Sequence, residues 1–188
     1  MKTLTYTLLP KSMLDLKAEG MPFWSTWWGE EPFAKEKARE ITVEIPVAFP
    51  IETLTTTGEK ALQMEGLLSA SEYAQVLWLY YQATKEYLYG YYWSWTSSRS
   101  SDGHLVCLGS FDSSGARVDG GRPSSSASGL GVALSRQAIV PSVPLSSSSP
   151  LELGRLEGKI DQILSLLEND KVPGFQFDKQ GRLKVTNK

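Results

Sequence analysis

The sequence predicts an α+β fold in which one main helix packs with short antiparallel strands. A capped segment from Ser69 to about Lys85 has apolar residues at helical spacing. The run Glu40–Phe49 alternates apolar and polar residues with the period of a strand. Between Tyr91 and Gln137, short apolar stretches alternate with turn-forming dipeptides, as in hairpins. With 188 residues, 41% of them hydrophobic, the chain can bury a core and carry further segments.

Residues 1–61 are expected to be a β-rich N-terminal segment that is part of the main domain or packs on it. Leu4–Leu9 is a possible first strand. In the run Glu40–Phe49, one face of the expected strand holds Ile41, Val43, Ile45 and Val47, which indicates a half-buried strand. Pro46 favours a position at the edge of a sheet, because proline has no amide hydrogen to donate to a neighbouring strand.

Three tryptophans lie close together in this segment, at Trp24, Trp27 and Trp28. Such a cluster could be a platform on which sugars stack. Packing against a neighbouring layer or subunit is the commoner role for aromatic residues at this spacing, and we take it as the default interpretation.

The segment after Ser69 carries the clearest helix signal in the chain. Ser69 and Glu72 have the spacing of a capping box, in which each side chain accepts a hydrogen bond from the other residue's backbone amide. One face of the helix is apolar and consists of Tyr73, Val76, Leu77, Tyr80 and Tyr81. This stripe is typical of a core-facing helix and does not indicate a cofactor site.

Residues 62–140 are expected to form the region that displays ligand-binding side chains. Its strand candidates are Tyr91–Thr96, His104–Phe111, Ala116–Val118 and Gly131–Ser135. The breaks between them contain Asp102-Gly103, Ser114-Gly115 and Asp119-Gly120-Gly121, which suit turns that need positive φ. Serine, glycine, aspartate and arginine dominate the segments between the strand candidates. Small polar side chains of this kind are cheap to order and are common in adaptable binding surfaces.

The C-terminal quarter divides into three segments. Residues 141–150 are a Ser/Pro linker by composition. Residues 151–170 are expected to form an amphipathic helix that joins copies of the chain into a homo-oligomer such as a trimer. Its apolar residues have the 3, 4, 3, 4 spacing of a short coiled coil: Leu153, Leu156, Ile160, Ile163 and Leu167. The alternative is a helix that folds back onto its own domain. Residues 171–188 are expected to hold a small hairpin.

Composition excludes several classes of partner. A net charge of −2 gives no basic field for holding nucleic acid through its phosphates. No apolar run reaches 18 residues, so no membrane insertion is expected, and the first residues do not resemble a signal peptide. The chain is therefore expected in the cytoplasm or, if it is a phage protein, in the virion.

The reactive side chains do not form a recognisable catalytic or metal site. Cys107 lies in an apolar run and is expected to be a buried, inert thiol, and one cysteine allows no disulfide within the chain. His104 is three residues away, so on a strand the two side chains point to opposite faces. No enzyme activity and no cofactor are expected. Calcium stays open, because Asp102, Asp112 and Asp119 are expected in loops.

The order of several motifs resembles the C-type lectin-like fold over residues 62–137. These motifs are the capped helix LSASEYAQVLWLYY, the strand YWSWTSS, the hairpin GSFDSSGARVD, an Arg-Pro-serine loop and the final GVALSR. They are most similar to the major paralogous domain family first noted in Fibrobacter and in related bacterial and phage proteins, some of which carry a retroelement-diversified, hypervariable surface.

The resemblance implies two sets of positions. Framework positions would hold the fold: Trp93, Trp95, Phe111, Gly115, Gly131, Val132, Leu134 and Arg136. Display positions would contact the ligand: Ser97, Arg99, Ser101, Asp102, Asp112, Ser113, Arg117, Asp119, Arg122, Ser124, Ser125, Ser126 and Ser128. The same fold hosts formylglycine-generating enzymes and sulfoxide synthases, but their chemistry needs a cysteine pair or three histidines, and this chain has one of each residue.

These expectations together describe a non-enzymatic display protein that binds a cell-surface protein or glycan. A phage virion component, such as a tail-tip receptor binder or a capsid decoration that contacts other virion proteins, would combine display, oligomerisation and the absence of a signal peptide. The alternative is a purely structural virion or filament subunit that recognises no ligand.

Overall fold

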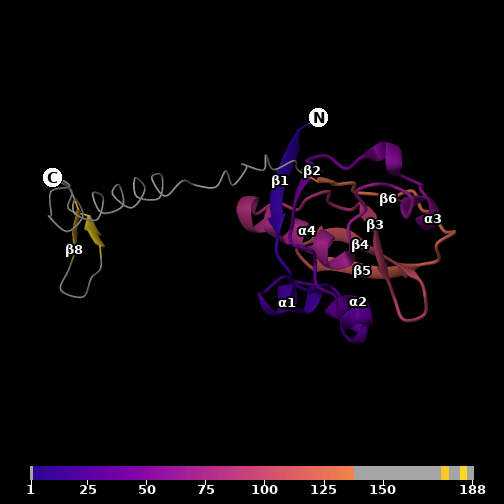
Figure 1. The fold of residues 1–188 in the computed structure, drawn as a ribbon, viewed down its shortest axis with the longest axis horizontal. Helices are drawn as coiled ribbons and strands as arrows, with labels where there is room; N and C mark the ends of the chain where they lie inside the picture. The colour runs from indigo at the N-terminus through magenta and orange to yellow at the C-terminus, as the bar shows by residue number, and fades with distance from the viewer. Residues whose placement is uncertain (1, 138–174, 178–182, 186–188) are drawn as a thin grey trace, which may run out of the picture. The chain divides into compact units, whose positions relative to one another are not determined.

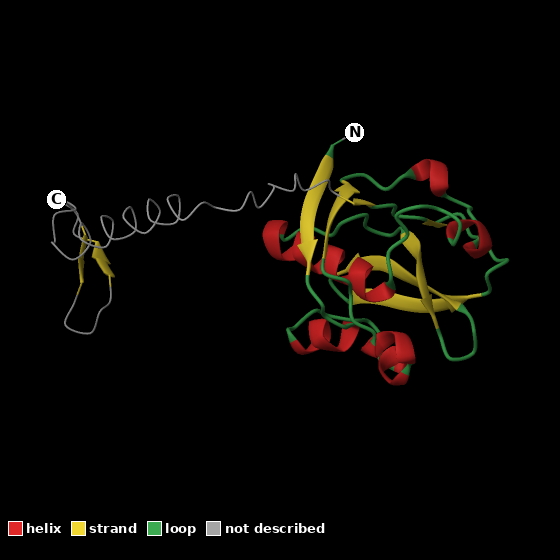
Figure 2. Cartoon of the chain, in the orientation of Figure 1, coloured by secondary structure: helices red, strands yellow, loops and turns green. Residues whose placement is uncertain are grey.

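The computed structural model describes residues 2–137, 175–177 and 183–185 of the chain (Figure 1). The chain divides into two compact units, Met1–Val140 and Pro141–Lys188. The first unit combines helices with two β-sheets, which confirms the α+β class (Figure 2). The expected linker at 141–150 and the expected helix at 151–170, with its seam from Leu153 to Leu167, lie outside the described residues.

The first sheet has three antiparallel strands in the order β1-β2-β7. They are β1 (Thr3–Leu8), β2 (Ile41–Pro46) and β7 (Arg136–Gln137). In β2 the buried residues Val43 and Ile45 alternate with half-buried ones, as the sequence pattern predicts.

The predicted edge position of the strand that contains Pro46 is wrong, because β2 lies in the middle of its sheet. Pro46 is the last residue of β2, opposite Thr3 at the start of β1. A proline is tolerated at a strand end because only a terminal hydrogen bond is lost. The pairing resumes beyond it, where the Val47 amide donates to the Lys2 carbonyl at 3.0 Å.

The main helix, α4 (Ala70–Thr84), begins at the predicted cap. The Glu72 amide donates to Ser69 Oγ at 3.3 Å and the Ser69 amide donates to Glu72 Oε2 at 2.8 Å, which confirms the capping box. Tyr73, Val76 and Leu77 are buried. The helix contacts strands of both sheets and so joins them into one core (Figure 1).

The second sheet has the order β5-β4-β3-β6. Its strands are β3 (Trp93–Arg99), β4 (Leu105–Asp112), β5 (Gly115–Gly121) and β6 (Leu130–Gly131). The β3–β4 and β4–β5 pairs are antiparallel, as the hairpin signals predict. β6 runs parallel to β3, so the sheet is mixed and the expectation of a purely antiparallel sheet is wrong.

The expected strand Gly131–Ser135 is also wrong beyond its first residue, because the chain crosses from the second sheet to the first there. The Val132 amide donates to Thr53 Oγ1 at 2.9 Å, the Ala133 amide to Ser94 Oγ at 2.8 Å, and the Ser135 amide to the Gly66 carbonyl at 3.0 Å. Side chains and a loop carbonyl replace the strand partner, so these three amides are satisfied without pairing to a strand.

Short helices fill the N-terminal segment, which is less β-rich than expected. Between and after β1 and β2 lie α1 (Met13–Ala18), η1 (Trp27–Glu30), α2 (Pro32–Lys35), η2 (Ile51–Thr53) and α3 (Gly58–Ala61). Several of their residues, including Met13, Trp28 and Phe33, belong to the same hydrophobic cluster as α4. The N-terminal segment is therefore part of the main domain.

The second unit contains one described element, an antiparallel pair of β8 (Phe175–Phe177) and β9 (Leu183–Val185). Phe175 pairs with Val185 and Phe177 with Leu183. This pair agrees with the hairpin expected near the C-terminus.

Candidate functional site

Burial separates the display positions from most of the framework positions. Every display residue is exposed or half-buried. Among the framework residues, Trp95, Phe111, Gly115, Gly131 and Val132 are buried, Trp93 and Leu134 are half-buried, and Arg136 alone is exposed. The polar side chains singled out from the sequence are thus accessible to a ligand, and the aromatic and small residues beside them form the frame.

The display residues do not all gather in one place. Ser101 and Asp102, in the turn between β3 and β4, lie with Asp119 of β5 around a pocket of about 310 Å³, which we name the acidic pocket. Its other lining residues are Trp27, Glu31, Ser100, His104 and Gly120. Three carboxylates and no lysine or arginine line this pocket.

Hydrogen bonds within the β3–β4 turn hold Asp102 in place. Ser100 Oγ donates to Asp102 Oδ1 at 2.5 Å, and Asp102 Oδ2 lies 2.6 Å from His104 Nδ1. The bond from Ser100, together with those from His104, lowers the pKa of Asp102 to about 2. Asp102 is therefore an anion at any physiological pH, and Gly103 beside it has the positive φ of 85° that the Asp-Gly pair predicts.

Glu31 and Trp27 come to the acidic pocket from the N-terminal segment. Glu31 accepts hydrogen bonds from the Ser101 amide at 2.7 Å and from Ser101 Oγ at 3.1 Å. Trp27 is 46% exposed, and its Nε1 donates to the Val118 carbonyl of β5 at 3.1 Å. Sequence reasoning missed Glu31, which no motif marks, and it treated Trp27 as a packing residue.

Asp119 also lines a second pocket, of about 340 Å³, on the face of the second sheet. Besides Asp119, this aromatic pocket is lined by Tyr91, Trp93, Cys107, Ala127, Gly129 and Leu130. Asp119 pairs across β4 and β5 with Cys107, so the two side chains share a face of the sheet. The aromatic pocket and the acidic pocket therefore share Asp119.

Cys107 is a buried free thiol, as expected from its apolar run. Burial and, to a lesser degree, the charge of Asp119 raise the pKa of Cys107 to about 12. The neutral thiol donates to the Asp119 carbonyl at 3.5 Å. A thiolate nucleophile is the reactive form of cysteine, and this environment disfavours it.

Arg117, Asp112 and Ser113 lie toward the other end of the β4–β5 hairpin. Arg117 Nη2 is 3.6 Å from Asp112 Oδ2, and the guanidinium carbon lies 5.4 Å from the centroid of the Trp24 ring. Trp24 is 63% exposed. The predicted packing role thus holds for Trp28, which is fully buried, but Trp24 and Trp27 have large accessible surfaces.

The remaining display residues lie on other surfaces. Arg122, Ser124, Ser125, Ser126 and Ser128 are exposed in the loop between β5 and β6. Arg99, at the end of β3, donates from Nη1 to the Gly103 carbonyl at 3.1 Å. Asp112 and Asp119 are strand residues, so their expected position in loops is wrong.

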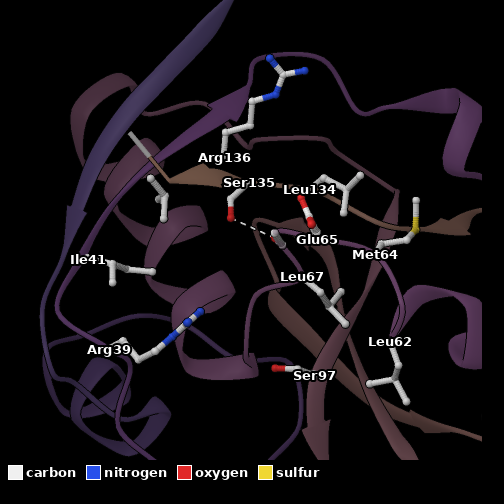
Figure 3. A pocket seen from close by; sticks show the side chains of 12 residues that line it. Arg39, Ile41, Leu62, Met64, Glu65, Leu67, Ser97, Leu134, Ser135 and Arg136 are labelled. Carbon is white, nitrogen blue, oxygen red and sulfur yellow. Dashed lines mark hydrogen bonds between the residues drawn. The ribbon is translucent and has the colours of Figure 1, made fainter. Parts of the chain in front are cut away.

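Ser97 is the one display residue in the larger cavity shown in Figure 3, whose volume is about 690 Å³. Arg39 points toward its middle, while Leu62, Met64 and Leu67 line the opposite side (Figure 3). The Arg39 guanidinium is held by the buried Glu72, at 2.6 Å from Nε to Oε1 and 3.2 Å from Nη2 to Oε2. This cavity could take an apolar group beside a fixed arginine, and no motif in the chain indicates it.

The three aspartates considered as calcium ligands do not lie together at one site. Asp102 and Asp119 share the acidic pocket, whereas Asp112 pairs with Gly115 at the far turn of the hairpin. Among the described residues, no three histidine, cysteine, aspartate or glutamate side chains are grouped so that they could hold a metal ion.

No family model, curated protein or solved structure matches the chain. Within the part of the chain that the structure describes, no helix has both the length and the apolar character needed to cross a membrane.

Proposed function

We propose that this chain is a non-enzymatic recognition protein with a C-type lectin-like domain, which binds a cell-surface protein or glycan through its Ser/Gly/Asp/Arg surface. The observation that carries the proposal is the separation described above: every display position is accessible, and all framework positions except Arg136 are at least half-buried. A frame of this kind tolerates change at the display positions, because exposed side chains contribute little to stability.

The order of elements also supports the proposal. The capped helix α4 precedes β3, the β4–β5 hairpin, the serine-rich loop and β6, in the order of the motifs that resemble the C-type lectin-like family. The centre of the binding surface would be Asp119, since it lines both the acidic and the aromatic pocket.

A virion component, at a phage tail tip or as a capsid decoration, is the setting in which such a surface would act. One shallow polar surface binds weakly, but several copies joined through the seam at Leu153, Leu156, Ile160, Ile163 and Leu167 would bind together. Linking copies raises the apparent affinity by about a hundredfold or more without any new contact.

The test is binding of the full-length protein to a glycan array and to whole bacterial cells, beside a variant with Arg117, Asp119 and Arg122 changed to Ala. We expect binding that the triple variant loses while its melting temperature stays within a few degrees of the unmodified protein. Binding that survives in a folded triple variant would contradict the proposed surface.

A purely structural subunit is the second candidate, and the exposure of Trp24 and Trp27 favours it. Large exposed aromatic residues are enriched at interfaces between proteins. In a virion or filament these two rings would be covered by a neighbouring subunit. Neither the array nor cells would then be bound, and the variant Trp24→Ala would assemble poorly.

A further inference from the structure

We propose that the aromatic pocket binds an organic cation, an ammonium group with alkyl substituents, on the ligand of this protein. The inference rests on the proposed function, because it specifies the chemistry of the surface around Asp119. Aromatic rings attract cations through the negative charge of their faces, and a carboxylate beside the rings adds direct attraction.

The aromatic wall of the pocket is held in place although much of it is exposed. Tyr91 is 70% exposed, yet its ring centroid lies 4.3 Å from that of Tyr92, and its hydroxyl donates to the Tyr92 hydroxyl at 3.0 Å. Tyr92 in turn stacks on Phe49 at 4.8 Å. A ring that is fixed before binding loses little conformational entropy when the ligand arrives.

The carboxylate of the pocket is free to meet a cation. Asp119 Oδ1 accepts a hydrogen bond from the Gly120 amide at 2.8 Å, and no lysine or arginine forms an ion pair with Asp119 in residues 2–137. Cys107 contributes a neutral thiol, since its pKa is raised to about 12. The single charge on the residues that line the pocket is therefore negative.

The neighbouring acidic pocket strengthens the preference for a cation. It adds Glu31 and Asp102, and like the aromatic pocket it has no lysine or arginine among its lining residues. An anionic group would be repelled by these carboxylates, and a neutral group without a hydrogen to donate would gain no attraction from them. A volume of about 340 Å³ is at the lower end of the range of small-ligand sites and holds a trimethylammonium group with room for its substituent.

The direct test is titration of the full-length protein with choline, followed by NMR or calorimetry. The control ligand is 3,3-dimethylbutan-1-ol, which has the shape of choline without the charge. We expect saturable binding of choline that is at least tenfold tighter than that of the neutral alcohol, and Asp119→Asn should reduce the affinity for choline about tenfold. Equal binding of both ligands, or no binding of either, would overturn the proposal.

A second variant fills the pocket without disturbing the fold. A Cβ at Gly129 would meet no atom within 4 Å, and the residue has no positive φ, so Gly129→Phe should fold and place its ring in the pocket. Gly29→Phe is the matched control, because Gly29 is equally open and is not among the residues that line this pocket. We expect Gly129→Phe to abolish choline binding and Gly29→Phe to leave it unchanged. Choline binding that persists in a folded Gly129→Phe protein would contradict the assignment.

Failure of this inference can be distinguished from failure of the proposed function. If the triple variant of Arg117, Asp119 and Arg122 loses cell or glycan binding while choline does not bind, the recognition surface stands and the cation pocket is wrong. If choline binds and Gly129→Phe blocks it, but neither glycans nor cells are bound, the pocket stands and the proposed cell-surface ligand is wrong.

Discussion

Gly121 of β5 lies directly under the indole of Trp95 in β3, although β4 runs between the two strands. A Cβ at Gly121 would overlap with Cη2 of the ring and lie 2.8 Å from Cζ3. The ring cannot move away easily, because Trp95 is buried and its Nε1 donates to the Thr56 carbonyl at 2.9 Å. The indole therefore spans the sheet only because position 121 has no side chain.

This contact predicts that Gly121→Ala destabilises the protein by about 1–3 kcal/mol, the usual cost of forcing an extra methyl group into a packed core. Chemical denaturation measures the change in the free energy of unfolding. Gly129→Ala is the control, because its Cβ would meet open space and its stability should hardly change. Equal stability of the Gly121→Ala variant and the unmodified protein would show that the indole can shift at little cost.

The role of Gly121 shows where sequence reasoning fails. The pattern Asp119-Gly120-Gly121 predicts a turn, since paired glycines commonly supply positive φ. β5 instead continues through all three residues, and neither glycine has a positive φ. The reason for Gly121 is a steric contact with Trp95, which is distant in the sequence. A local pattern cannot reveal such a contact.

Sequence patterns predict the structure correctly where it depends on interactions between residues close together in the chain. The capping box at Ser69, the alternation in β2 and the turn at Asp102-Gly103 each depend on residues a few positions apart, and each is present as predicted. The parallel pairing of β6 with β3 has no such signal, because a strand of two residues carries no period.

The candidate site likewise contains residues that the sequence predicts and one residue that it does not. The motif positions of Ser101, Asp102 and Asp119 predict accessible display residues, and the structure brings these three together in one pocket. Glu31 reaches the pocket from a segment about seventy residues earlier and is held there by Ser101. Its contribution depends on the tertiary fold, which the sequence pattern does not specify.

The ion pair between the buried Glu72 and the largely exposed Arg39 predicts loss of stability in acid. Burial alone would raise the pKa of Glu72, but hydrogen bonds from the Arg39 side chain and the Ser69 amide, with the charge of Arg39, hold it below the ordinary value of 4.5. A carboxyl whose pKa is lowered by folding stabilises the protein above its unfolded-state pKa, and this stabilisation is lost as the pH falls through the folded-state pKa.

We therefore expect the free energy of unfolding to decrease as the pH is lowered below about 4.5, and to decrease less steeply in Glu72→Gln. At pH 7 this variant should be less stable by about 1.5–3 kcal/mol, because the hydrogen bonds between Arg39 and a charged carboxylate are lost. Denaturation curves of both proteins at pH 7 and pH 3 measure the difference. A parallel decrease in the two proteins would assign the acid sensitivity to other carboxyl groups, such as Asp15, whose pKa is also lowered by its bonds to Ser12.

The heptad spacing of the C-terminal segment predicts an oligomer. Ile160 and Ile163 lie outside the described residues, so this prediction rests on the sequence alone. Replacing both with Asp would place charges in an apolar seam, and we expect the mass in solution to fall to that of a monomer. Light scattering measures this mass, and Asn169→Asp serves as a charge control outside the five seam positions. An unchanged mass in the double variant would show that the oligomer, if formed, uses another surface.

The tryptophans of the N-terminal segment should differ in how much stability is lost when each is replaced by alanine. Trp28 is fully buried, its Nε1 donates to the Ser25 carbonyl at 2.8 Å, and its ring lies 4.5 Å from that of Phe23, so Trp28→Ala should cost about 3–5 kcal/mol. Trp24 is 63% exposed and contacts the guanidinium of Arg117, so Trp24→Ala should cost about 0.5–1 kcal/mol. Thermal or chemical denaturation of the two variants checks this contrast.

If Trp24→Ala folds normally but loses cell or glycan binding, its ring belongs to the recognition surface. If this variant binds normally and only fails to assemble, the ring faces a neighbouring subunit. A cost for Trp24→Ala as large as for Trp28→Ala would contradict both roles, because the ring would then be part of the core.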